Sequence, residues 1–441
     1  MQQPREIVLQ ILYDIEVNKA YLNISFQNHM EKAGLFGRDV AFVKELVYGS
    51  VKQQLALDAS ISRMSSVKLR KLAPYVLCLL RLGLYQIFYM DKVPQSAAVN
   101  ETVSLAGKYA GRSRGFVNAI LRRATREGLT LPEGESREAL SVRYSHPAPL
   151  VEWMCNTFGQ AKAITILEAN QETPPLCLRT NTLKTTRDAL LAALHQAGVA
   201  AKAGSLNDVA VLVEGANIQG LAAYGEGLFT IQDQSAQLAA IALSPEPGQF
   251  VIDFCAAPGG KTTHLAELME NQGEILALDV YEKRLRSVTE SAKRLGHSII
   301  TTRAADGTKF TTERKADKIL VDAPCSGLGV IRRRPDLKYK PELTDFEGLE
   351  AVQLAILHQA AEALRGGGEL VYSTCTINPG ENEGVVKRFL ESHSDFSLQP
   401  VLSPHLSDAA AQTLQTGMGT LYPNQEQGDG FFIAKLKKEL S

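Results

Sequence analysis

The sequence contains no Cys-x-x-Cys pair, although its 441 residues include six cysteines. The cysteines are scattered singly at positions 78, 155, 177, 255, 325 and 375. Closely spaced cysteines are the usual signature of structural zinc sites and of disulfide-stapled secreted domains. We therefore expect reduced thiols, a cytoplasmic protein and no bound metal.

Long apolar runs and two familiar nucleotide-binding motifs are also lacking. No apolar stretch is long enough to span a bilayer, and no signal peptide opens the chain, so we expect no membrane partner. Neither Gly-x-Gly-x-x-Gly nor Gly-x-x-x-x-Gly-Lys-Ser/Thr occurs. Their absence disfavours a Rossmann oxidoreductase and a P-loop nucleotidase.

Charge is nearly balanced over the chain but not along it. The length predicts two to four domains, and 45% hydrophobic and 22% charged residues are ordinary for globular proteins. The net charge is −1, yet residues 1–143 carry +7 and the remainder carries −8. A basic amino-terminal part indicates a polyanionic partner, or else only a solvated helical surface.

Residues 1–143 are predicted to form an all-helical domain, because apolar residues recur at helical spacing and no strand pattern interrupts them. The stretch Pro74–Phe88 is apolar almost all round, which predicts a central buried helix. Six positive charges and no acid fall between residues 108 and 126. These candidate RNA-binding residues are Lys108, Arg112, Arg114, Arg122, Arg123 and Arg126. The segments Val93–Glu101 and Phe116–Arg122 resemble the NusB antitermination-factor domain, which implies a helical platform for RNA or protein.

Residues 144–235 are predicted to form a linker and a small α/β subdomain. Two strand-like segments, Leu176–Asn181 and Val209–Val213, flank a short helix over Asp188–Ala197, which suggests a βαβ-type unit. His146 lies just before Pro147, where packing or capping explains it better than a role as a base.

Residues 236–441 alternate between strands and helices. Repeated βα units predict a mostly parallel, doubly wound sheet. The predicted strands are the apolar run that starts at Val251, then Glu274–Asp279, Ile299–Thr302, Lys318–Asp322, Glu369–Ser373 and Gly430–Leu436. Ligands bind such sheets at the carboxyl ends of the strands.

The stretch Val251–Thr263 begins as an apolar run that suits a buried strand, breaks at Pro258-Gly259-Gly260 and continues as a helix. Glycines in such a turn let the backbone approach a ligand, and the amides of the helix start offer donors. Asp279 closes the second strand and Asp306 follows the third, where they could bind a ribose and an adenine. A helix N-cap is an equally good explanation for either aspartate alone. Arg284 is a weaker candidate.

Two cysteines, Cys325 and Cys375, follow the ends of the fourth and fifth strands. A cysteine is usually a small buried hydrophobe, which suits Cys78, Cys155 and Cys177. Two at one sheet edge, the first close to Asp322, fit covalent catalysis better. The C5 atom of cytosine becomes nucleophilic when a thiolate adds to C6, and a second group must then help to expel that thiolate.

The strings Asp-x-Cys-Ala-Ala-Pro-Gly-Gly-Lys-Thr, Asp-Ala-Pro-Cys-Ser-Gly and Ser-Thr-Cys-Thr resemble motifs I, IV and VI of the Sun (Fmu) family of RNA 5-methylcytosine methyltransferases. Asn378-Pro379-x-Glu381-Asn382-Glu383 follows the last of them. The resemblance covers residues 145–441. It implies an α/β Rossmann-like methyltransferase domain that acts on C5 of a cytosine in 16S ribosomal RNA and uses S-adenosylmethionine.

The resemblance also implies the roles of individual residues. Cys375 is the expected nucleophile, Cys325 assists release and Asp322 contacts the cytosine. The expected cofactor-binding residues are Cys255, Ala256, Ala257, Pro258, Gly259, Gly260, Lys261, Asp279, Arg284, Asp306 and Asp322. The run Arg332–Arg334 could grip RNA phosphates, although a solvated basic loop explains it nearly as well.

A different class of function remains open. A non-catalytic RNA-binding or antitermination factor could keep a degenerate methyltransferase fold, as the NusB-like head suggests. Such a protein would have no chemical need for Asp322, Cys325 and Cys375. The oligomeric state is not encoded in a readable pattern, and we expect a monomer.

Overall fold

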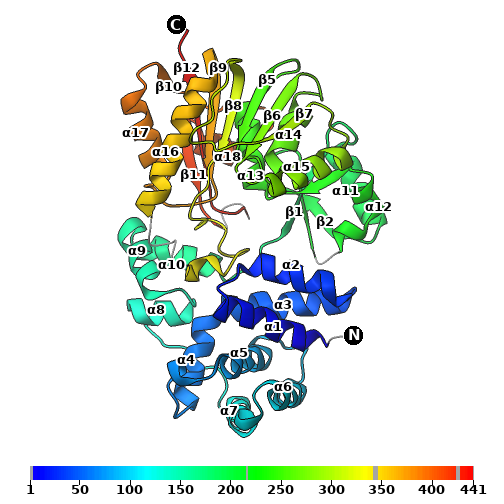
Figure 1. Cartoon of the computed structure of the whole chain (residues 1–441), viewed down its shortest axis with the longest axis vertical. Coiled ribbons are helices and arrows are strands. Elements are labelled where there is room, and N and C mark those ends of the chain that lie inside the picture. The colour runs from blue at the N-terminus through cyan, green and yellow to red at the C-terminus, as the bar shows by residue number, and fades with distance from the viewer. Residues whose placement is uncertain (1–2, 215–216, 341–345, 424–427, 441) are drawn as a thin grey trace. The chain divides into compact units, whose positions relative to one another are not determined.

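A computed structural model describes residues 3–214, 217–340, 346–423 and 428–440 (Figure 1). The chain divides into two compact units, one of residues 1–172 with 331–340, the other of residues 173–330 with 341–441. The expected domain boundaries of 1–143, 144–235 and 236–441 stay predictions.

The first unit is helical in its described residues, as the apolar spacing predicted. Its helices are α1 (Pro4–Val17), α2 (Leu22–Ala33), α3 (Arg38–Lys52), α4 (Gln54–Met64), α5 (Pro74–Tyr89), α6 (Gln95–Tyr109), α7 (Arg114–Glu127), α8 (Arg137–Arg143), α9 (Ala148–Phe158) and α10 (Gln160–Ala169). Short 3-10 turns cover Leu69–Lys71, Gly111–Ser113 and Leu337–Tyr339.

Helix α5 is the centre of this unit. It packs against α1, α3, α4, α6 and α7, and its residues 76–87 are all buried. The prediction of a central apolar helix over Pro74–Phe88 is thus confirmed. Its one buried charge, Arg81, donates to Asp58 at 2.7 Å and to Glu16 at 2.6 Å, which satisfies a guanidinium that would be costly to bury alone.

The second unit contains a small sheet and a large one. The small sheet has the order β2-β3-β1-β4 and is built from β1 (Leu176–Thr180), β2 (Ala201–Ala203), β3 (Ala210–Val213) and β4 (Phe229–Ile231). Helix α11 (Arg187–Gln196) covers one face, and the 3-10 turn Ile218–Gly220 and α12 (Ala222–Gly225) precede β4.

The small sheet corrects one prediction. Strands β1 and β3 pair antiparallel, with Leu178 opposite Val211, so Val209–Val213 is not the second strand of the expected βαβ-type unit. The strand β2, which follows α11, also pairs antiparallel with β3 and therefore runs parallel to β1. The parallel crossover is β1-α11-β2, and β3 lies between its two strands.

The large sheet has the order β10-β12-β9-β8-β5-β6-β7, with β11 paired to β12. Its strands are β5 (Phe250–Phe254), β6 (Glu274–Asp279), β7 (Ile300–Ala304), β8 (Ala316–Asp322), β9 (Leu364–Thr374), β10 (Phe396–Leu398), β11 (Met418–Leu421) and β12 (Phe431–Lys438). Strands β5 to β9 pair in parallel and β12 runs antiparallel to β9, which confirms the mostly parallel sheet.

Helices cover both faces of the large sheet (Figure 1). The helices of this part of the chain are α13 (Gln234–Leu243), α14 (Gly260–Leu268), α15 (Glu282–Leu295), α16 (Phe346–Ala363), α17 (Glu383–Ser392) and α18 (Asp408–Thr413). Along β5, Ile252 faces the core shared with α16 and α17, while Val251 faces the core shared with α13 and α14. This alternation explains why the strands read as continuous apolar runs.

Candidate active site

The turn between β5 and α14 contains a glycine in the left-handed backbone conformation, which only glycine adopts readily. Cys255 has φ 61° and Gly259 has φ 105°, both in the left-handed region. A Cβ at Gly259 would lie 2.9 Å from Cα of Val288, so only glycine fits there. The turn thereby brings bare backbone to the carboxyl edge of the sheet, where Gly260 begins α14.

Asp279 lies at the carboxyl end of the neighbouring strand β6 and is almost fully buried. Its carboxylate accepts a hydrogen bond from the backbone N of Tyr281 at 3.0 Å and pairs with Arg284 at 3.3 Å. Arg284 also donates to the carbonyl O of Ala257 at 3.1 Å. The structure therefore joins the glycine turn to Asp279 through Arg284, the residue that the sequence ranked lowest.

Asp306 is held in a local turn after β7. Its carboxylate accepts from Thr308 Oγ1 at 2.7 Å and from Thr308 N at 3.0 Å, and these bonds, with Lys309 nearby, keep its pKa below the usual range. The side chain is 44% exposed. Local turn chemistry thus accounts for this aspartate, and its proposed contact with adenine stays a prediction.

Lys261, in the first turn of α14, reaches across to Asp322 at the end of β8, with Nζ 2.7 Å from Oδ2. Burial opposes its charge, but the carboxylate of Asp322 outweighs burial and raises the pKa of Lys261. The other oxygen of Asp322 accepts from Ser373 Oγ at 3.0 Å. The pair places a positive and a negative group side by side at the same edge as the cysteines.

Cys325 and Cys375 lie against each other, with their sulfur atoms 3.3 Å apart. They follow β8 and β9, which are adjacent parallel strands, so the topology alone brings the two loops together. A hydrogen bond to Cys375, burial and the charge of Cys375 all raise the pKa of the Cys325 thiol well above its ordinary value. The Cys325 thiol therefore holds its proton more tightly than an exposed cysteine does.

The other cysteines behave as the sequence predicted for hydrophobic thiols. Cys78, Cys155 and Cys177 are buried, and burial raises the pKa of Cys78 to about 12. His146 is fully buried, and burial lowers the pKa of its imidazole. Its ring nitrogens lie within hydrogen-bond distance of the carbonyl O of Tyr144 and of Asn170 Nδ2. It packs and does not serve as an exposed base.

Sequence reasoning missed a buried ion pair beneath the glycine turn. Arg179 on β1 and Glu267 on α14 are fully buried and pair at 2.8 Å. Arg179 also donates to Thr263 Oγ1 at 3.0 Å, to the carbonyl O of Gly260 and to Gln232. The only signal was a charged residue in an otherwise apolar strand. The pair connects the small sheet to α14, the helix that follows the glycine turn.

The run Arg332–Arg334, for which the sequence left phosphate binding and a solvated basic loop open, is partly buried, and its contact with RNA phosphates stays a prediction. Residues 331–340 belong to the helical unit, and only 3% of Arg332 is exposed. Arg334 donates to Asn23 at 3.2 Å, and Asp336 accepts from the backbone N of Leu22 at 3.1 Å. Tertiary packing therefore buries Arg332 and leaves Arg333 and Arg334 half-buried, so the run is not the fully solvated loop that it resembles in the sequence.

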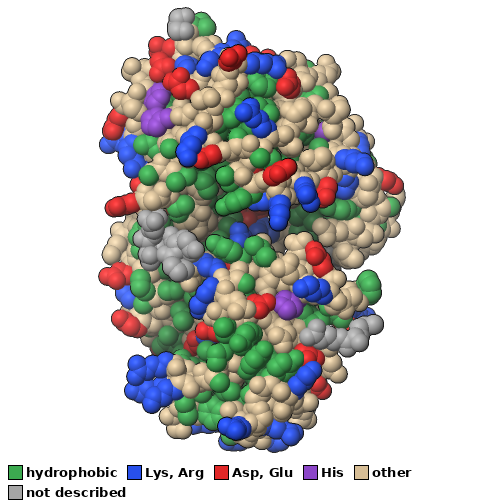
Figure 2. Space-filling view, viewed as in Figure 1, with side chains coloured by type: hydrophobic (Ala, Val, Ile, Leu, Met, Phe, Trp, Pro, Cys, Tyr) green, Lys and Arg blue, Asp and Glu red, His purple; other side chains and the backbone are tan. Residues whose placement is uncertain are grey.

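The predicted basic cluster lies on α6, the 3-10 turn after it and α7, and all its members except the half-buried Arg123 are exposed. Figure 2 shows Lys and Arg side chains along the lower edge of the helical unit. Lys108 pairs with Glu6 and Arg123 pairs with Glu127. The exposed arginines that lie outside these two ion pairs are Arg112, Arg114, Arg122 and Arg126. Four guanidinium groups on one turn and helix suit phosphate binding.

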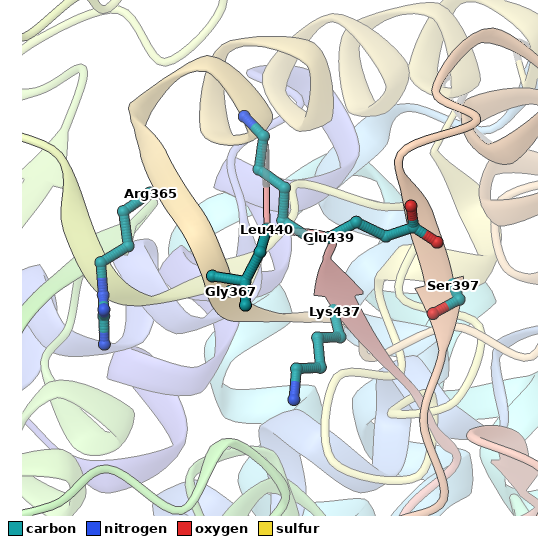
Figure 3. A pocket seen from close by; sticks show the side chains of 7 residues that line it. Arg365, Gly367, Ser397, Lys437, Glu439 and Leu440 are labelled. Atoms are coloured by element: carbon teal, nitrogen blue, oxygen red, sulfur yellow. The ribbon is translucent and has the colours of Figure 1, made fainter.

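A basic hollow of about 380 Å³ lies at the opposite edge of the large sheet (Figure 3). It is lined by Arg365, Gly367, Ser397 and the strand end Lys437–Leu440. A second hollow, lined by residues of α15 and β7, includes Leu285 and Thr302. Neither contains a cysteine, so neither is part of the candidate site.

Within the described ranges, no helix has the length and apolarity needed to cross a bilayer. The same residues contain no cluster of three or more His, Cys, Asp or Glu side chains arranged to hold a metal ion.

The two units match known domain families. Residues 240–437 match the family described as 16S rRNA methyltransferase RsmB/F, residues 2–126 match the NusB family, and residues 146–219 match the ferredoxin-like domain of RsmF/B-like methyltransferases. The carboxyl-terminal unit thus has the fold of an α/β methyltransferase, preceded by an all-helical NusB domain.

Relatives match over almost the whole chain. The probable ribosomal RNA small subunit methyltransferase B of Bacillus subtilis is 37% identical over 99% of this chain and 98% of its own, and its Synechocystis counterpart is 37% identical over 99% and 100%. The chain belongs to the RsmB/F family of methyltransferases.

Solved structures agree. A crystal structure of PH0851 has a TM-score of 0.83 at 26% identity and covers 99% of both chains. The structure of NSun6 from Pyrococcus horikoshii with SFG has a TM-score of 0.60 at 28% identity, over 67% of this chain and 99% of that one.

Proposed function

We propose that this protein methylates C5 of a cytosine in small-subunit (16S) ribosomal RNA, using S-adenosylmethionine and a covalent cysteine–cytosine adduct. The observation that carries the proposal is the pair Cys325–Cys375, with sulfurs 3.3 Å apart, at the edge that also holds Lys261 and Asp322. The names of the full-length relatives support ribosomal RNA as the substrate.

The two cysteines suit different steps. In the proposed reaction the thiolate of Cys375 adds to C6 of the cytosine, and C5 then attacks an electrophilic methyl group. Cys325, whose pKa is raised by its bond to Cys375 and by burial, is a poor attacking thiolate. It is better suited to the later step, in which the C5–H and C6–S bonds break. The C5 proton passes to solvent, and Cys325 gives its own proton to the departing Cys375 thiolate.

Asp322 and Lys261 are placed to act on the base. Their side chains meet at 2.7 Å between the glycine turn and the cysteine loops. An acid near N3 of the cytosine stabilises the adduct by neutralising the charge that develops there. Lys261 also holds Asp322 in place before the base arrives.

The residues around the glycine turn fit an adenosine cofactor. S-adenosylmethionine supplies the methyl group as a sulfonium. The buried carboxylate of Asp279 suits ribose hydroxyls, and the turn over Cys255–Lys261 has no room for a side chain at Gly259. The exposed apolar residues Val280 and Tyr281 follow Asp279 directly, where they can shield an adenine ring. Arg284, Asp306 and Asp322 complete the proposed set.

The NusB domain is proposed to hold the RNA. Its exposed arginines on α7 and the turn before it can neutralise phosphates without reading sequence. A purely RNA-binding role without chemistry is the competing function, and the NusB match favours it. The adjacent cysteines and the Lys261–Asp322 pair argue against it, because a binding module needs neither.

The test is methyl transfer in vitro. Purified protein, methyl-labelled S-adenosylmethionine and 16S ribosomal RNA should yield label in RNA, and bisulfite sequencing should place it at a single cytosine. RNA binding without label, under conditions where the folded protein retains S-adenosylhomocysteine, would favour the non-catalytic function.

We further propose that the protein acts in the cytoplasm as a monomer.

A further inference from the structure

The carboxylate of Glu381 is fully buried in the loop between β9 and α17. One oxygen accepts from the backbone N of Ser326 at 2.9 Å and from Gln353 Nε2 at 2.9 Å. The other accepts from Ser326 Oγ and from Asn378 Nδ2 at 3.2 Å. A buried carboxylate is costly unless donors surround it, and here both oxygens are satisfied by donors from three separate segments.

These donors lie next to the two cysteines. Ser326 follows Cys325, Thr376 follows Cys375, and their hydroxyl oxygens are 2.7 Å apart. Gln353 Nε2 also donates to the carbonyl O of Pro324, the residue before Cys325, at 2.9 Å. Glu381 therefore holds the Cys325 loop from both sides and bonds it to the Cys375 loop one residue beyond the sulfurs.

The neighbouring Asn382 fixes the other loop. Its Oδ1 accepts from Thr374 Oγ1 at 2.6 Å, and its Nδ2 donates to the carbonyl O of Thr376 at 3.1 Å. Thr374 and Thr376 flank Cys375 in the chain. Asn382 therefore fixes the residues on both sides of Cys375. Glu381, the residue before Asn382, binds Ser326 and so fixes the position of the Cys325 loop relative to the Cys375 loop.

We propose that Glu381 is a positioning residue that holds the Cys325 thiol against Cys375; the proposal rests on the proposed function, because it assigns the geometry that function needs. Glu381 does not reach the base or the cofactor residues in any contact described here. Its charge adds to the hydrogen bond from Cys375 and to burial in raising the pKa of Cys325. It therefore also helps Cys325 to keep the proton that the release step uses.

The first test is Glu381→Gln in the full-length protein. The amide presents an NH2 group where an oxygen now accepts from two donors, so one side of the network must open. A displacement of about 1 Å at a reacting group costs on the order of a hundredfold in rate. We expect kcat to fall about a hundredfold, while the KM for RNA and the affinity for S-adenosylhomocysteine stay within about twofold.

A second readout does not depend on activity. Phenylarsine oxide forms two As–S bonds with a pair of adjacent thiols, and its oxygen leaves as water with the two thiol protons. Wild-type protein should capture it through the Cys325–Cys375 pair, as shown by loss of capture in Cys325→Ala and in Cys375→Ala. Glu381→Gln should weaken capture at least tenfold. The matched control is Glu383→Gln, since the carboxylate of Glu383 accepts from Thr420 Oγ1 on β11 at 3.1 Å.

Ser326→Ala supplies a second variant in case Glu381→Gln fails to fold. It removes the hydroxyl that donates to Glu381 and meets Thr376, with little change in volume. We expect a smaller loss of capture and of kcat in the same direction. Wild-type capture and kcat in both variants would overturn the positioning role. If the wild-type protein methylates no RNA, the proposed function fails, and arsenical capture still decides whether Glu381 sets the thiol pair.

Discussion

Lys261 Nζ lies 2.7 Å from Asp322 Oδ2, although the two residues belong to motifs 61 positions apart. The contact joins the proposed cofactor turn to the proposed cytosine-binding loop. It also explains why Lys261 stays charged at a buried position, since Asp322 raises its pKa against the effect of burial. The two sites are thus one electrostatic unit.

We predict that Lys261→Ala lowers the single-turnover rate of methyl transfer about 10²- to 10³-fold, because a buried charge next to the reacting base is removed. The measurement is label transfer to RNA at saturating cofactor. Lys387→Ala changes an exposed lysine on α17 and should retain the wild-type rate. Equal rates in both variants would show that the ion pair is only structural.

Asp279→Ala should weaken S-adenosylhomocysteine binding by about 2–3 kcal/mol, because ribose hydroxyls would lose a charged acceptor. Isothermal calorimetry on the full chain gives the affinity directly. Glu391→Ala, at an exposed position of α17, should bind as the wild type does. An unchanged affinity in Asp279→Ala would refute the placement of the ribose at this carboxylate.

Arg179→Met should destabilise the protein by about 3–5 kcal/mol, because it leaves Glu267 buried without its partner. The double variant Arg179→Met with Glu267→Leu should recover part of the loss. Urea unfolding followed by circular dichroism provides the free energies. A single variant as stable as the wild type would mean that Glu267 finds other donors.

Replacing Arg112, Arg114, Arg122 and Arg126 with Gln should flatten the salt dependence of RNA binding. Each lost phosphate contact lowers the slope of log K against log salt by about 0.7–0.9, so the change can reach about 3. The control replaces Arg365 and Lys437, which line the hollow at the opposite sheet edge. An unchanged slope in the fourfold variant would assign α7 to a protein partner or to solvent.

The sequence predicted the strands that are buried on both faces, because their side chains are apolar in an unbroken run. Strand β6 (Glu274–Asp279) was placed to the residue, because a buried parallel strand is apolar throughout. The three-residue strand β2 was missed, since Ala201–Ala203 is mostly exposed and has no periodicity to detect. Without β2, the direction of β3 could not be inferred.

The site could be predicted for residues that directly follow the end of a parallel strand, since such ends meet at one edge of the sheet. Both cysteines follow strand ends, so their shared edge followed from topology. The contacts of Arg179 with Glu267 and of Ser326 with Glu381 join residues 88 and 55 positions apart. No local pattern encodes such pairs. Arg332 shows the converse, since a basic run that resembles a solvated loop is packed into the helical unit.

The division of labour between the cysteines is the central claim. Cys375→Ala should neither methylate RNA nor form a covalent complex, because the attacking thiolate is gone. Cys325→Ala should attack and transfer the methyl group but stall before release.

The most direct measurement is denaturing electrophoresis of each variant after incubation with S-adenosylmethionine and 16S ribosomal RNA. The account predicts a protein–RNA band of reduced mobility for Cys325→Ala and none for Cys375→Ala. The band in Cys375→Ala alone would reverse the two roles, and full methylation by both single variants would contradict covalent catalysis altogether.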